Sequence, residues 1–492
     1  MTSLWLSTSP PIATDPFEPG AFYDVVVVGA GITGMVSAVL LARAGHRVAV
    51  VDARGVGTGT TGNTTAKISQ LQGTQLSKVH SHGYPSLVAA YAHSARAAFD
   101  WLVDYTAHTG VPIERRDAYT YAATPGGVDA VDHEHELARS VGLDVRLLPE
   151  APLPFLTHRA VQLRDQAQLN PLDLLAALAA EFRSLGGTLV EHVRVEGVRA
   201  SNPVVVRTTA GDATAGKVIL ATGTPILDRG LYFAKVSAKR SYAQSFTVPA
   251  AELPDGMFLG VEHPTRSIRT SGPLLLTGGN GHGVGREASP QSRVDELTEW
   301  TLRHWPGASR THAWSAQDYS PAHHVPFVGW LPRGRGRVYL ATGYDKWGMT
   351  NGVSAALTLA ADIAGENTEW QKTLHHRVTM PRAIATGIGE NAAVAWWYLR
   401  GYGRALSTAL PATAPAEGTG VVGRSGIHPT AVSTVDGLTC SLSAVCSHLG
   451  AAVTWNDAEK SWDCPAHGSR FAPDGAVLEG PATRSLGTRS RR

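Results

Sequence analysis

Cysteine, long apolar runs and net charge are all scarce in this chain of 492 residues. Its three cysteines are too few for a disulfide framework and favour a reducing compartment, so we expect a cytoplasmic protein. The 43 basic and 41 acidic residues leave a net charge of +2, which gives no reason to expect nucleic acid or an anionic membrane as a partner. No apolar run reaches the ~18 residues that span a membrane.

The first twenty residues also lack the features of a targeting segment. The sequence MTSLWLSTSPPIATDPFEPG has no basic start and no long apolar stretch, so we interpret it as an irregular surface arm rather than a secretory signal. The whole chain is longer than one hydrophobic core usually supports, which predicts two or three domains.

The stretch from Asp24 to Asp52 has the pattern of a dinucleotide-binding βαβ unit. The four valines at 25–28 predict a strand buried on both faces, and apolar residues then recur at helical spacing over 32–41. Residues 47–51 predict a second strand that ends at Asp52. This order of strand, helix, strand and acid is the context in which a glycine fingerprint indicates nucleotide binding.

Gly29, Gly31 and Gly34 form that fingerprint at G-x-G-x-x-G spacing. Gly29 allows the tight turn out of the strand, Gly31 lets the backbone approach a pyrophosphate, and Gly34 lets the helix pack on the sheet. The free N–H groups at the helix N-terminus favour a phosphate. Asp52 is placed to accept a hydrogen bond from a ribose hydroxyl.

Later segments predict the rest of the large portion. A Gly- and Thr-rich loop at 55–73 suits ligand contact. Two buried strands end in Ala-Thr-Gly, one at 217–223 and one at 338–343, and a helix is expected from about Gly352. Further helices are expected at 86–108, 128–141 and 172–185.

Two other patterns resemble a second nucleotide fingerprint and a metal site, but we expect neither. The run GGNGHGVG at 278–285 has the wrong glycine spacing for a second fingerprint and predicts a loop. His133 and His135 are two residues apart on an expected helix, so they point to different sides and predict a solvated face rather than a metal site.

Over about residues 3–375, these motifs resemble the FAD-dependent amine and amino-acid oxidoreductases of the D-amino-acid oxidase family. The fingerprint, the loop TTGNTTAK, the segment LNPLDLLAALA and the closing ATGYDKWGMTNG carry the resemblance. The SLWL-type opening is most similar to the γ-glutamylputrescine oxidoreductases of that family. The resemblance implies an α/β FAD-binding domain of the Rossmann-like, glutathione-reductase type, interleaved with an α+β substrate domain. It also implies oxidation of a C–N bond in a small amine or amino acid by hydride transfer to the flavin.

The resemblance assigns a set of residues to FAD, with Asp52 standing where family members usually carry a glutamate. The implied FAD contacts are Gly29, Gly31, Ile32, Thr33, Gly34, Asp52, Ala53, Arg54, Thr61, Thr65, Ala66, Lys67, Val195, Ala221, Thr222, Gly223, Gly343, Trp347, Gly348, Met349 and Thr350.

The substrate face is less distinct. The stretches KRSYAQSF at 239–246 and TRSIRT at 265–270 resemble strands that line the substrate pocket in this family. Arg240, Tyr242 and Arg269 are candidates to hold a substrate carboxylate or amine, because a guanidinium binds a carboxylate through two parallel hydrogen bonds. Arginines on the surface of a meander are the alternative. Lys346 follows the flavin turn and suits either stabilisation of a reduced flavin anion or a structural ion pair.

The C-terminal region carries a metal-binding pattern. Cys446-Ser447-His448 is followed after fifteen residues by Cys464-Pro465-Ala466-His467. Cys446 and Cys464 can bind one iron of a [2Fe–2S] cluster while His448 and His467 bind the other. Tetrahedral zinc is the alternative for two cysteines and two histidines. The flanking sequences SHLGA, WDCPAHGSRF and GPA resemble Rieske domains throughout 421–487, which favours the cluster.

The expected domain organisation follows from both resemblances. FAD-binding segments are expected at about 20–95, 165–235 and 335–375, a substrate domain at about 96–164 and 236–334, a helix and linker at 376–420, and a small all-β Rieske domain at 421–492.

Three functions are compatible with this combination. A reduced flavin holds two electrons and a Rieske cluster takes one at a time, so the first is a dehydrogenase that passes electrons singly through the cluster to an external acceptor. The second is an oxidase that reduces O₂ directly, with a structural or regulatory cluster. The third is an electron-transfer protein without small-molecule turnover. We find no second nucleotide fingerprint and no mononuclear iron set in the sequence, which counts against a nicotinamide-dependent reductase and a Rieske oxygenase.

We predict that the FAD is bound non-covalently. All three cysteines lie beyond residue 439, and Asn63 stands near the position at which some family members carry a linking histidine. After acid precipitation, the flavin absorbance should appear in the supernatant. Flavin that stays with the precipitated polypeptide would contradict the prediction.

We also predict a cluster potential in the lower half of the Rieske range of about −150 to +300 mV. High-potential Rieske domains carry a disulfide between the ligand loops, where Ala451 and Ala466 stand here, and a tyrosine hydroxyl where Phe471 stands. Ser469 remains as a donor to a cluster sulfur. Fewer donors leave the added electron less stabilised. Redox titration measures the midpoint, and a value near the top of the range would refute this prediction.

Overall fold

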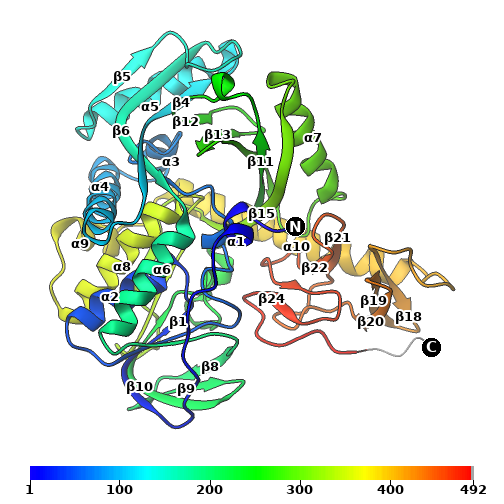
Figure 1. Ribbon diagram of the computed structural model, residues 1–492. Helices are drawn as coiled ribbons and strands as arrows, with labels where there is room; N and C mark the ends of the chain where they lie inside the picture. Colours follow the sequence, from blue (N-terminus) through cyan, green and yellow to red (C-terminus); the bar gives the residue numbers. More distant parts are fainter. Residues whose placement is uncertain (489–492) are drawn as a thin grey trace.

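The computed structural model describes residues 1–488 and contains two large β-sheets and a small β domain (Figure 1). The strands of the two large sheets alternate along residues 1–375, and the small domain follows a long helix. The expected fold class, an α/β dinucleotide-binding domain interleaved with a second domain and followed by a small all-β domain, is confirmed. The last residues of the predicted Rieske domain, 489–492, lie outside the described part.

The first large sheet has a parallel centre in the order β7-β2-β1-β10-β17. The valines at 25–28 pair with β2 on one side and β10 on the other, and they are buried, as their β-branched run predicted. Two antiparallel additions, β16 and the β8–β9 hairpin, complete the sheet. Its strands are β1 (Phe22–Val28), β2 (Val48–Val51), β7 (Thr188–Val190), β8 (Val195–Arg199), β9 (Val204–Thr208), β10 (Gly211–Leu220), β16 (Phe327–Trp330) and β17 (Val338–Thr342).

A layer of helices covers one face of this sheet. Val25 and Val27 pack in the same core as the buried face of α2, whereas Val26 and Val28 point to the opposite core. The helices that pack together here are α2 (Ile32–Arg43), α4 (Pro85–Thr109), α6 (Pro171–Ser184) and α8 (Gly348–Ala364), with α9 (Glu369–His375) against α4. Helix α4 runs unbroken through residue 95, where a domain boundary was expected.

Helix α8 begins at Gly348, four residues before the expected start at Gly352. Gly352 lies inside the helix and faces α2. A Cβ at this position would stand 2.9 Å from Ile32 Cγ2 and 2.9 Å from Thr33 Oγ1. The glycine therefore permits close packing of two helices and does not mark a helix boundary.

The second large sheet has nine strands and is mainly antiparallel. The run at 278–285, expected to be a loop, instead lies largely in β14, where Gly278 pairs with Ala243 and Ser267. A Cβ at Gly279 would stand 2.2 Å from Thr265 O, so the glycine is required by close strand approach. The strands are β3 (Lys67–Ile68), β4 (Ile113–Ala122), β5 (Val145–Leu148), β6 (Arg159–Leu169), β11 (Val236–Thr247), β12 (Met257–Gly260), β13 (Arg266–Ser271), β14 (Leu274–Gly283) and β15 (Ser309–Pro321).

Three helices accompany the second sheet. Glu134, in the His133-Glu134-His135 segment of one of them, caps the N-terminus of another. His133 is exposed and His135 is half-buried, but Glu134 between them is buried. Its carboxylate accepts from the backbone N–H groups of Leu76 (3.0 Å) and Ser77 (2.9 Å) at the start of α3. The helices are α3 (Gln75–His82), α5 (Val128–Ser140) and α7 (Pro290–His304).

The N-terminal segment is only in part the irregular surface arm that we expected: residues 9–20 have no helix or strand and none is buried, but its start is ordered. It forms the short helix α1 (Leu4–Thr8), and Leu4 and Trp5 are buried in the first core. The Ser3 hydroxyl donates to Gly62 O at 2.5 Å, and the Trp5 indole N–H donates to Thr64 O at 2.7 Å. The apolar pair and these two donors anchor the arm against the 55–73 loop.

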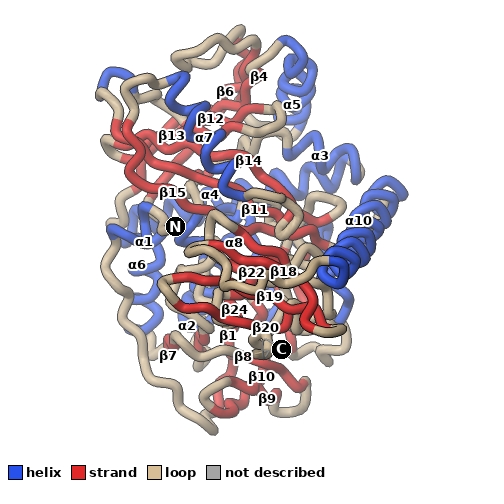
Figure 2. The backbone as a smooth tube through the Cα atoms, turned by 90° about the vertical axis from the view of Figure 1, so that its right-hand side faces the viewer, coloured by secondary structure: helices blue, strands red, loops and turns tan. Residues whose placement is uncertain are grey.

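The C-terminal portion consists of the long helix α10 (Pro381–Ser407) and two small sheets. Figure 2 shows these sheets on the near side of the molecule, with α10 along their edge. Within residues 1–488, no helix is both long and apolar enough to cross a membrane. The strands are β18 (Thr419–Ser425), β19 (His428–Val435), β20 (Leu438–Ser443), β21 (Thr454–Asn456), β22 (Ser461–Asp463), β23 (Arg470–Phe471) and β24 (Val477–Glu479).

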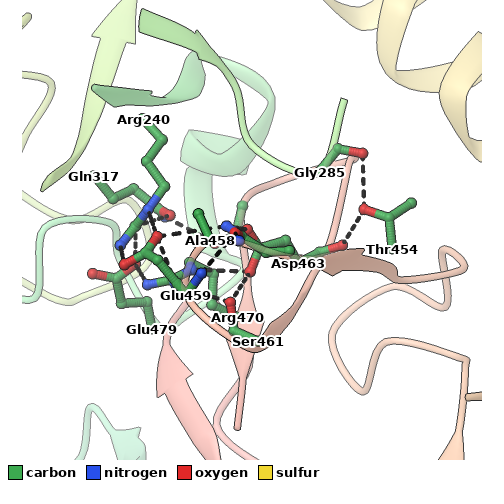
Figure 3. Close-up of polar contacts among 12 residues, drawn as sticks. Arg240, Gly285, Gln317, Thr454, Ala458, Glu459, Ser461, Asp463, Arg470 and Glu479 are labelled. Atoms are coloured by element: carbon green, nitrogen blue, oxygen red, sulfur yellow. Dashed lines mark hydrogen bonds and ion pairs between the residues drawn. The ribbon is translucent and has the colours of Figure 1, made fainter. Parts of the chain in front are cut away.

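A buried ion-pair network holds the small domain against the second large sheet (Figure 3). Arg240 on β11 reaches into the small domain, where Nη2 donates to Glu459 Oε1 at 2.6 Å and Nη1 donates to Glu479 Oε2 at 3.2 Å. Arg470 binds the same two glutamates and also Asp463, whose Oδ1 lies 3.0 Å from Nε. The exposed fraction of the arginine side chains is 3% for Arg240 and 6% for Arg470.

The arginines hold the carboxylates of this network ionised. Burial raises the pKa of Glu459, but the adjacent Arg240 and Arg470 outweigh burial and lower it to about 2. An unfolded glutamate has a pKa of about 4.3. The folded pKa is therefore depressed, so the stabilisation is present above about pH 4.3 and is lost as the pH falls through about 2.

Substitution of Arg240 by Met should undock and destabilise the small domain. Glu459 and Glu479 would keep only Arg470 as an ion-pair partner, and breaking a buried pair in this way costs about 3–5 kcal/mol. Calorimetry together with limited proteolysis of the 411–420 linker measures this loss. The control Lys372→Ala breaks an exposed pair with Glu369 and should cost less than about 1 kcal/mol. Equal effects of the two substitutions would contradict the prediction.

Candidate functional site

A cavity of about 690 Å³ lies where the two large sheets and the small domain meet. One wall comes from the glycine turn after β1 and the end of β2, and another from the turn between β17 and α8. The strands of the second sheet form the far side. The small domain also contributes to the wall, through Leu478, Glu479, Gly480 and Ala482.

The nucleotide fingerprint forms one end of this cavity. Gly29 has φ of 107°, and a Cβ there would stand 2.5 Å from Ala221 O, so only glycine fits the turn. Gly31 is the N-cap of α2 and has no side chain to cap it. The Ile32 N–H donates to Thr61 Oγ1 at 3.1 Å, and the other N–H groups of the first turn can face a phosphate. Asp52 lines the cavity, and its two carboxylate oxygens accept from Ala30 N and Arg54 N, each at 2.8 Å.

Most of the predicted FAD contacts line the cavity. The exceptions are Gly34, Ala66 and Thr350, which do not lie on its wall. Gly34 packs on the turn, since a Cβ would stand 1.8 Å from Gly29 O. Ala66 has φ of 51°, and its carbonyl accepts from Arg269. Thr350 accepts a hydrogen bond from Gln72 at 2.7 Å inside the core. These three residues therefore shape the wall from behind.

Lys67 lines the cavity but already has protein partners. Its ammonium group donates to Phe258 O at 2.8 Å and to Ser267 Oγ at 2.5 Å. Burial, together with the nearby charge of Arg269, lowers its pKa to about 7. At neutral pH a lysine with so low a pKa is only partly charged, so its clearest role is to join β3 to β12 and β13 of the second sheet by these hydrogen bonds.

The turn before α8 is conformationally strained. Asp345 and Lys346 have φ of 47° and 73°, a left-handed conformation that costs a non-glycine residue of the order of 1–3 kcal/mol. The Asp345 carboxylate accepts from Ser320 at 2.5 Å and lies 2.7 Å from His324 Nδ1. Burial raises the pKa of Asp345, but His324 and the neighbouring Lys78 outweigh burial and hold it well below its usual range.

Asp318 is the cavity carboxylate with the opposite shift. Burial and the adjacent charge of Asp345 raise its pKa to about 7, and the backbone N–H of Lys346 donates to it. One of these two acids is thus held ionised while the other exchanges a proton near neutral pH. Paired carboxylates with separated pKa values are a hallmark of acid–base sites.

Two of the four predicted substrate residues face the cavity. Tyr242 lies on its wall, with its hydroxyl 3.1 Å from His282 Nε2, and Lys346 projects from the strained turn. Arg240 and Arg269 are not among the residues that line the cavity. The guanidinium of Arg240 is occupied by Glu459 and Glu479 of the small domain.

Arg269 is also held away from the cavity. It is buried behind the wall, where it donates to Ala66 O at 3.1 Å and to Leu169 O at 3.4 Å. Its guanidinium carbon lies 5.3 Å from the Trp5 ring centroid. Both arginines lie on strands whose other residues line the cavity, but protein partners hold their guanidinium groups elsewhere.

Sequence reasoning missed several ionisable residues on the cavity wall. Asp318 and Asp345 gave no spacing signal, because they come from β15 and the turn after β17. His324 lies in the turn before β16 and also gave no spacing signal. The missed cavity residues are Lys78, Lys239, Asp318, His324, Tyr344 and Asp345.

The four predicted metal ligands come together on two loops of the small domain. The Cys446 and Cys464 thiols are buried and hydrogen bonded to each other. The rings of His448 and His467 lie edge to face with centroids 5.2 Å apart. His467 Nδ1 is buried with no hydrogen-bond partner among the described residues, which is the state of a nitrogen that ligates a metal.

The hydrogen bonds around the two sulfurs fit a cluster better than an ordinary thiol pair. The pKa of Cys446 is lowered to about 7, chiefly because Cys464 donates to it; Ser469 and backbone N–H groups of the same loop also donate. Among residues 1–488, no three His, Cys, Asp or Glu side chains converge on a position for one metal ion. Two separate pairs, one of sulfur and one of nitrogen, match a binuclear centre with one pair per iron.

Only one residue separates the cavity wall from the cysteine pair. Ala482 lines the cavity, and its backbone N–H donates to Ser469 Oγ at 3.0 Å. The Ser469 hydroxyl in turn donates to the sulfur of Cys446. The nucleotide cavity and the predicted cluster site are therefore in contact through this short path.

Comparison with protein families identifies both parts of the chain. Residues 24–362 match the family of FAD-dependent oxidoreductases that includes the D-amino-acid oxidases, and residues 411–489 match the Rieske [2Fe-2S] domain. The chain belongs to the FAD-dependent oxidoreductase family and carries a C-terminal Rieske domain. It is 30% identical over 473 residues to the Rieske 2Fe-2S iron-sulfur protein YhfW of Bacillus subtilis (strain 168), covering 94% of this chain and 92% of that protein.

Solved structures share the fold of the oxidoreductase portion. Glycine oxidase from Geobacillus kaustophilus is similar with a TM-score of 0.63 and 22% identity, over 73% of this chain and 99% of its own. L-Proline dehydrogenase from P. horikoshii is similar with a TM-score of 0.61 and 17% identity, over 73% of this chain and 97% of its own. At these identities the comparison establishes the fold alone.

The oxidoreductase therefore uses FAD and a Rieske [2Fe–2S] cluster. The N-terminus of α2, which has no N-cap side chain, and the cradle around Gly29 fit the dinucleotide. Cys446, Cys464, His448 and His467 fit the cluster, with the unpartnered Nδ1 of His467 as the most direct structural sign.

Proposed function

We propose that this oxidoreductase dehydrogenates a C–N bond of a small amine or amino acid and passes the electrons singly through its cluster to an external acceptor. When bound, FAD supplies the hydride acceptor and the cluster supplies a one-electron carrier. The observation that carries the proposal is the shared wall, because Gly480 and Ala482 of the Rieske domain line the same cavity as the glycine fingerprint.

The contact between the two sites favours a relay over a purely structural cluster. The path from the cavity through Ala482 and Ser469 to Cys446 consists of two hydrogen bonds. A structural metal would stabilise the Rieske domain equally well at any distance from the cavity. Placement of its ligand loops beside the cavity is consistent with transfer of electrons between them.

The charged groups in the cavity suit an amine substrate. An amine must lose its ammonium proton before a C–N bond can be oxidised by hydride transfer. We assign this proton to the Asp318 carboxylate, whose pKa of about 7 is close to neutrality. Asp345 stays ionised and orients His324, and Lys346 also lines the cavity, where burial lowers its pKa.

Anaerobic stopped-flow mixing with a panel of primary and secondary amines and amino acids tests the proposal. We expect flavin absorbance to bleach first and the cluster to be reduced in a second phase. The matched control is Cys464→Ser, which should retain the flavin phase and lose the cluster phase. Bleaching reversed at once by O₂, with an unresponsive cluster, would instead support a simple oxidase. No bleaching with any compound would support an electron carrier without turnover.

The pH dependence of kcat/KM tests the role of Asp318. Because the carboxylate must be ionised to accept a proton, kcat/KM should rise with pH up to about 7 and then level off. Asp318→Asn should lower kcat/KM by about 10²–10⁴-fold and remove this acidic limb. The control Asp104→Asn changes an exposed carboxylate on α4 and should leave the profile unchanged. Retention of the limb in Asp318→Asn would refute the assignment.

A further inference from the structure

The cluster histidines are covered by a segment of the FAD-binding portion, not by the Rieske domain itself. This segment comprises Asp228 and the following short helix η3 (Arg229–Ala234), between β10 and β11. The Phe233 ring meets the edges of both imidazoles, with centroids 5.2 Å from His448 and 4.9 Å from His467. The environment of the cluster is therefore built by two domains.

One histidine of the pair is bonded to a carboxylate across this domain contact. Asp228 Oδ1 lies 2.8 Å from His448 Nε2, and only 6% of the His448 side chain is exposed. Within residues 1–488, His467 makes no corresponding hydrogen bond to an acid. Instead, the guanidinium of Arg286 lies on the His467 side, where its Nε donates to Pro465 O at 2.9 Å.

The atoms used by this contact determine what it does. An imidazole that binds iron through one nitrogen carries its proton on the other nitrogen. With Nε2–H donating to Asp228, the Nδ1 atom of His448 is left for the metal, which matches the unpartnered Nδ1 of His467. A carboxylate that accepts from a ligating histidine fixes its ring orientation and makes it a more basic ligand.

We propose that Asp228 is a positioning residue for the Rieske centre. It holds His448 with Nδ1 toward the iron, and its negative charge lowers the reduction potential of the cluster. A more basic ligand and a nearby anion both stabilise the oxidised cluster relative to the reduced one, which carries an additional negative charge. Because Asp228 belongs to the FAD-binding portion, the low potential exists only while the Rieske domain is docked.

This inference is independent of the proposed amine oxidation, since the potential of the cluster is measured without substrate. It also accounts for a difference between the two histidines within residues 1–488: His448 is bonded to a carboxylate and His467 is not. Cys446, Cys464, His448 and His467 could bind the same cluster in a free domain, but that domain would lack the Asp228 contact. In the docked protein, electrons therefore pass to a cluster whose reduction potential depends on the FAD-binding portion that donates them.

Redox titration of the purified holoenzyme at one fixed pH tests the proposal, with Asp228→Asn as the main variant. We expect the ratio of reduced to oxidised cluster at the wild-type midpoint potential to rise about tenfold, the low end of the 10–100-fold effects of outer-shell partners. For a one-electron couple this corresponds to an upward shift of about 59 mV. The spectrum of the reduced cluster by electron paramagnetic resonance should change as well, because the His448 ligand is altered.

Two further variants make the result decisive. Asp436→Asn removes an exposed carboxylate from the Rieske surface without touching a ligand, so it reports the effect of charge alone. Asp228→Glu keeps the carboxylate and should restore most of the wild-type potential. A shift in Asp228→Asn no larger than that in Asp436→Asn, with full iron and sulfide content, would overturn the proposal.

Loss of the cluster is also informative. If Asp228→Asn loses iron and Asp228→Glu retains it, the carboxylate is needed to orient His448, which supports the positioning role. If both variants lose iron while the flavin content and the folded state are unchanged, the segment acts only by packing and the proposal fails. The substitution Phe233→Leu, which removes the ring contact alone, should leave the midpoint close to the wild-type value.

Discussion

The arrangement of this oxidoreductase depends on the buried contact between Arg240 and the carboxylates of the Rieske domain. Arg240 and Arg470 face Glu459, Glu479 and Asp463, and these five side chains are largely removed from water. Charges buried in this way are tolerable only when each has its partners, so few other orientations of the domain are open. The ion pairs therefore select one docking geometry, whatever their net contribution to stability.

Because of this docking geometry, each domain contributes residues to the cofactor site of the other. The strand end at 478–482 brings the Rieske domain into the wall of the FAD cavity. The segment at 228–234 brings the FAD-binding portion onto the cluster histidines. Each cofactor site is thus completed by residues of the other domain. A freely tethered Rieske domain would share the same ligands but neither of these contacts.

The residues whose roles follow from the sequence differ in kind from those whose roles do not. Gly29, Gly31 and Asp52 were found from spacing, because a nucleotide turn imposes its demands on residues that are close in sequence. Arg240 was assigned to the substrate because an arginine on a pocket strand suits a carboxylate. In the structure a carboxylate does bind it, but that carboxylate belongs to Glu459, 219 residues further along the chain. The preferred chemistry was right and the partner was wrong.

Local pattern was enough to indicate the βαβ unit and the Rieske domain and to predict the FAD fingerprint and the four cluster ligands, since turn geometry and metal-ligand spacing are short-range properties of the chain. It was not enough for Asp318, Asp345 or Asp228, whose roles arise from neighbours on other strands, loops and domains. Burial and opposing charges decide which of these carboxylates keeps a proton, and docking decides which one meets His448. Such properties exist only once distant segments have packed together, because desolvation and Coulomb interactions depend on distance in space rather than in sequence.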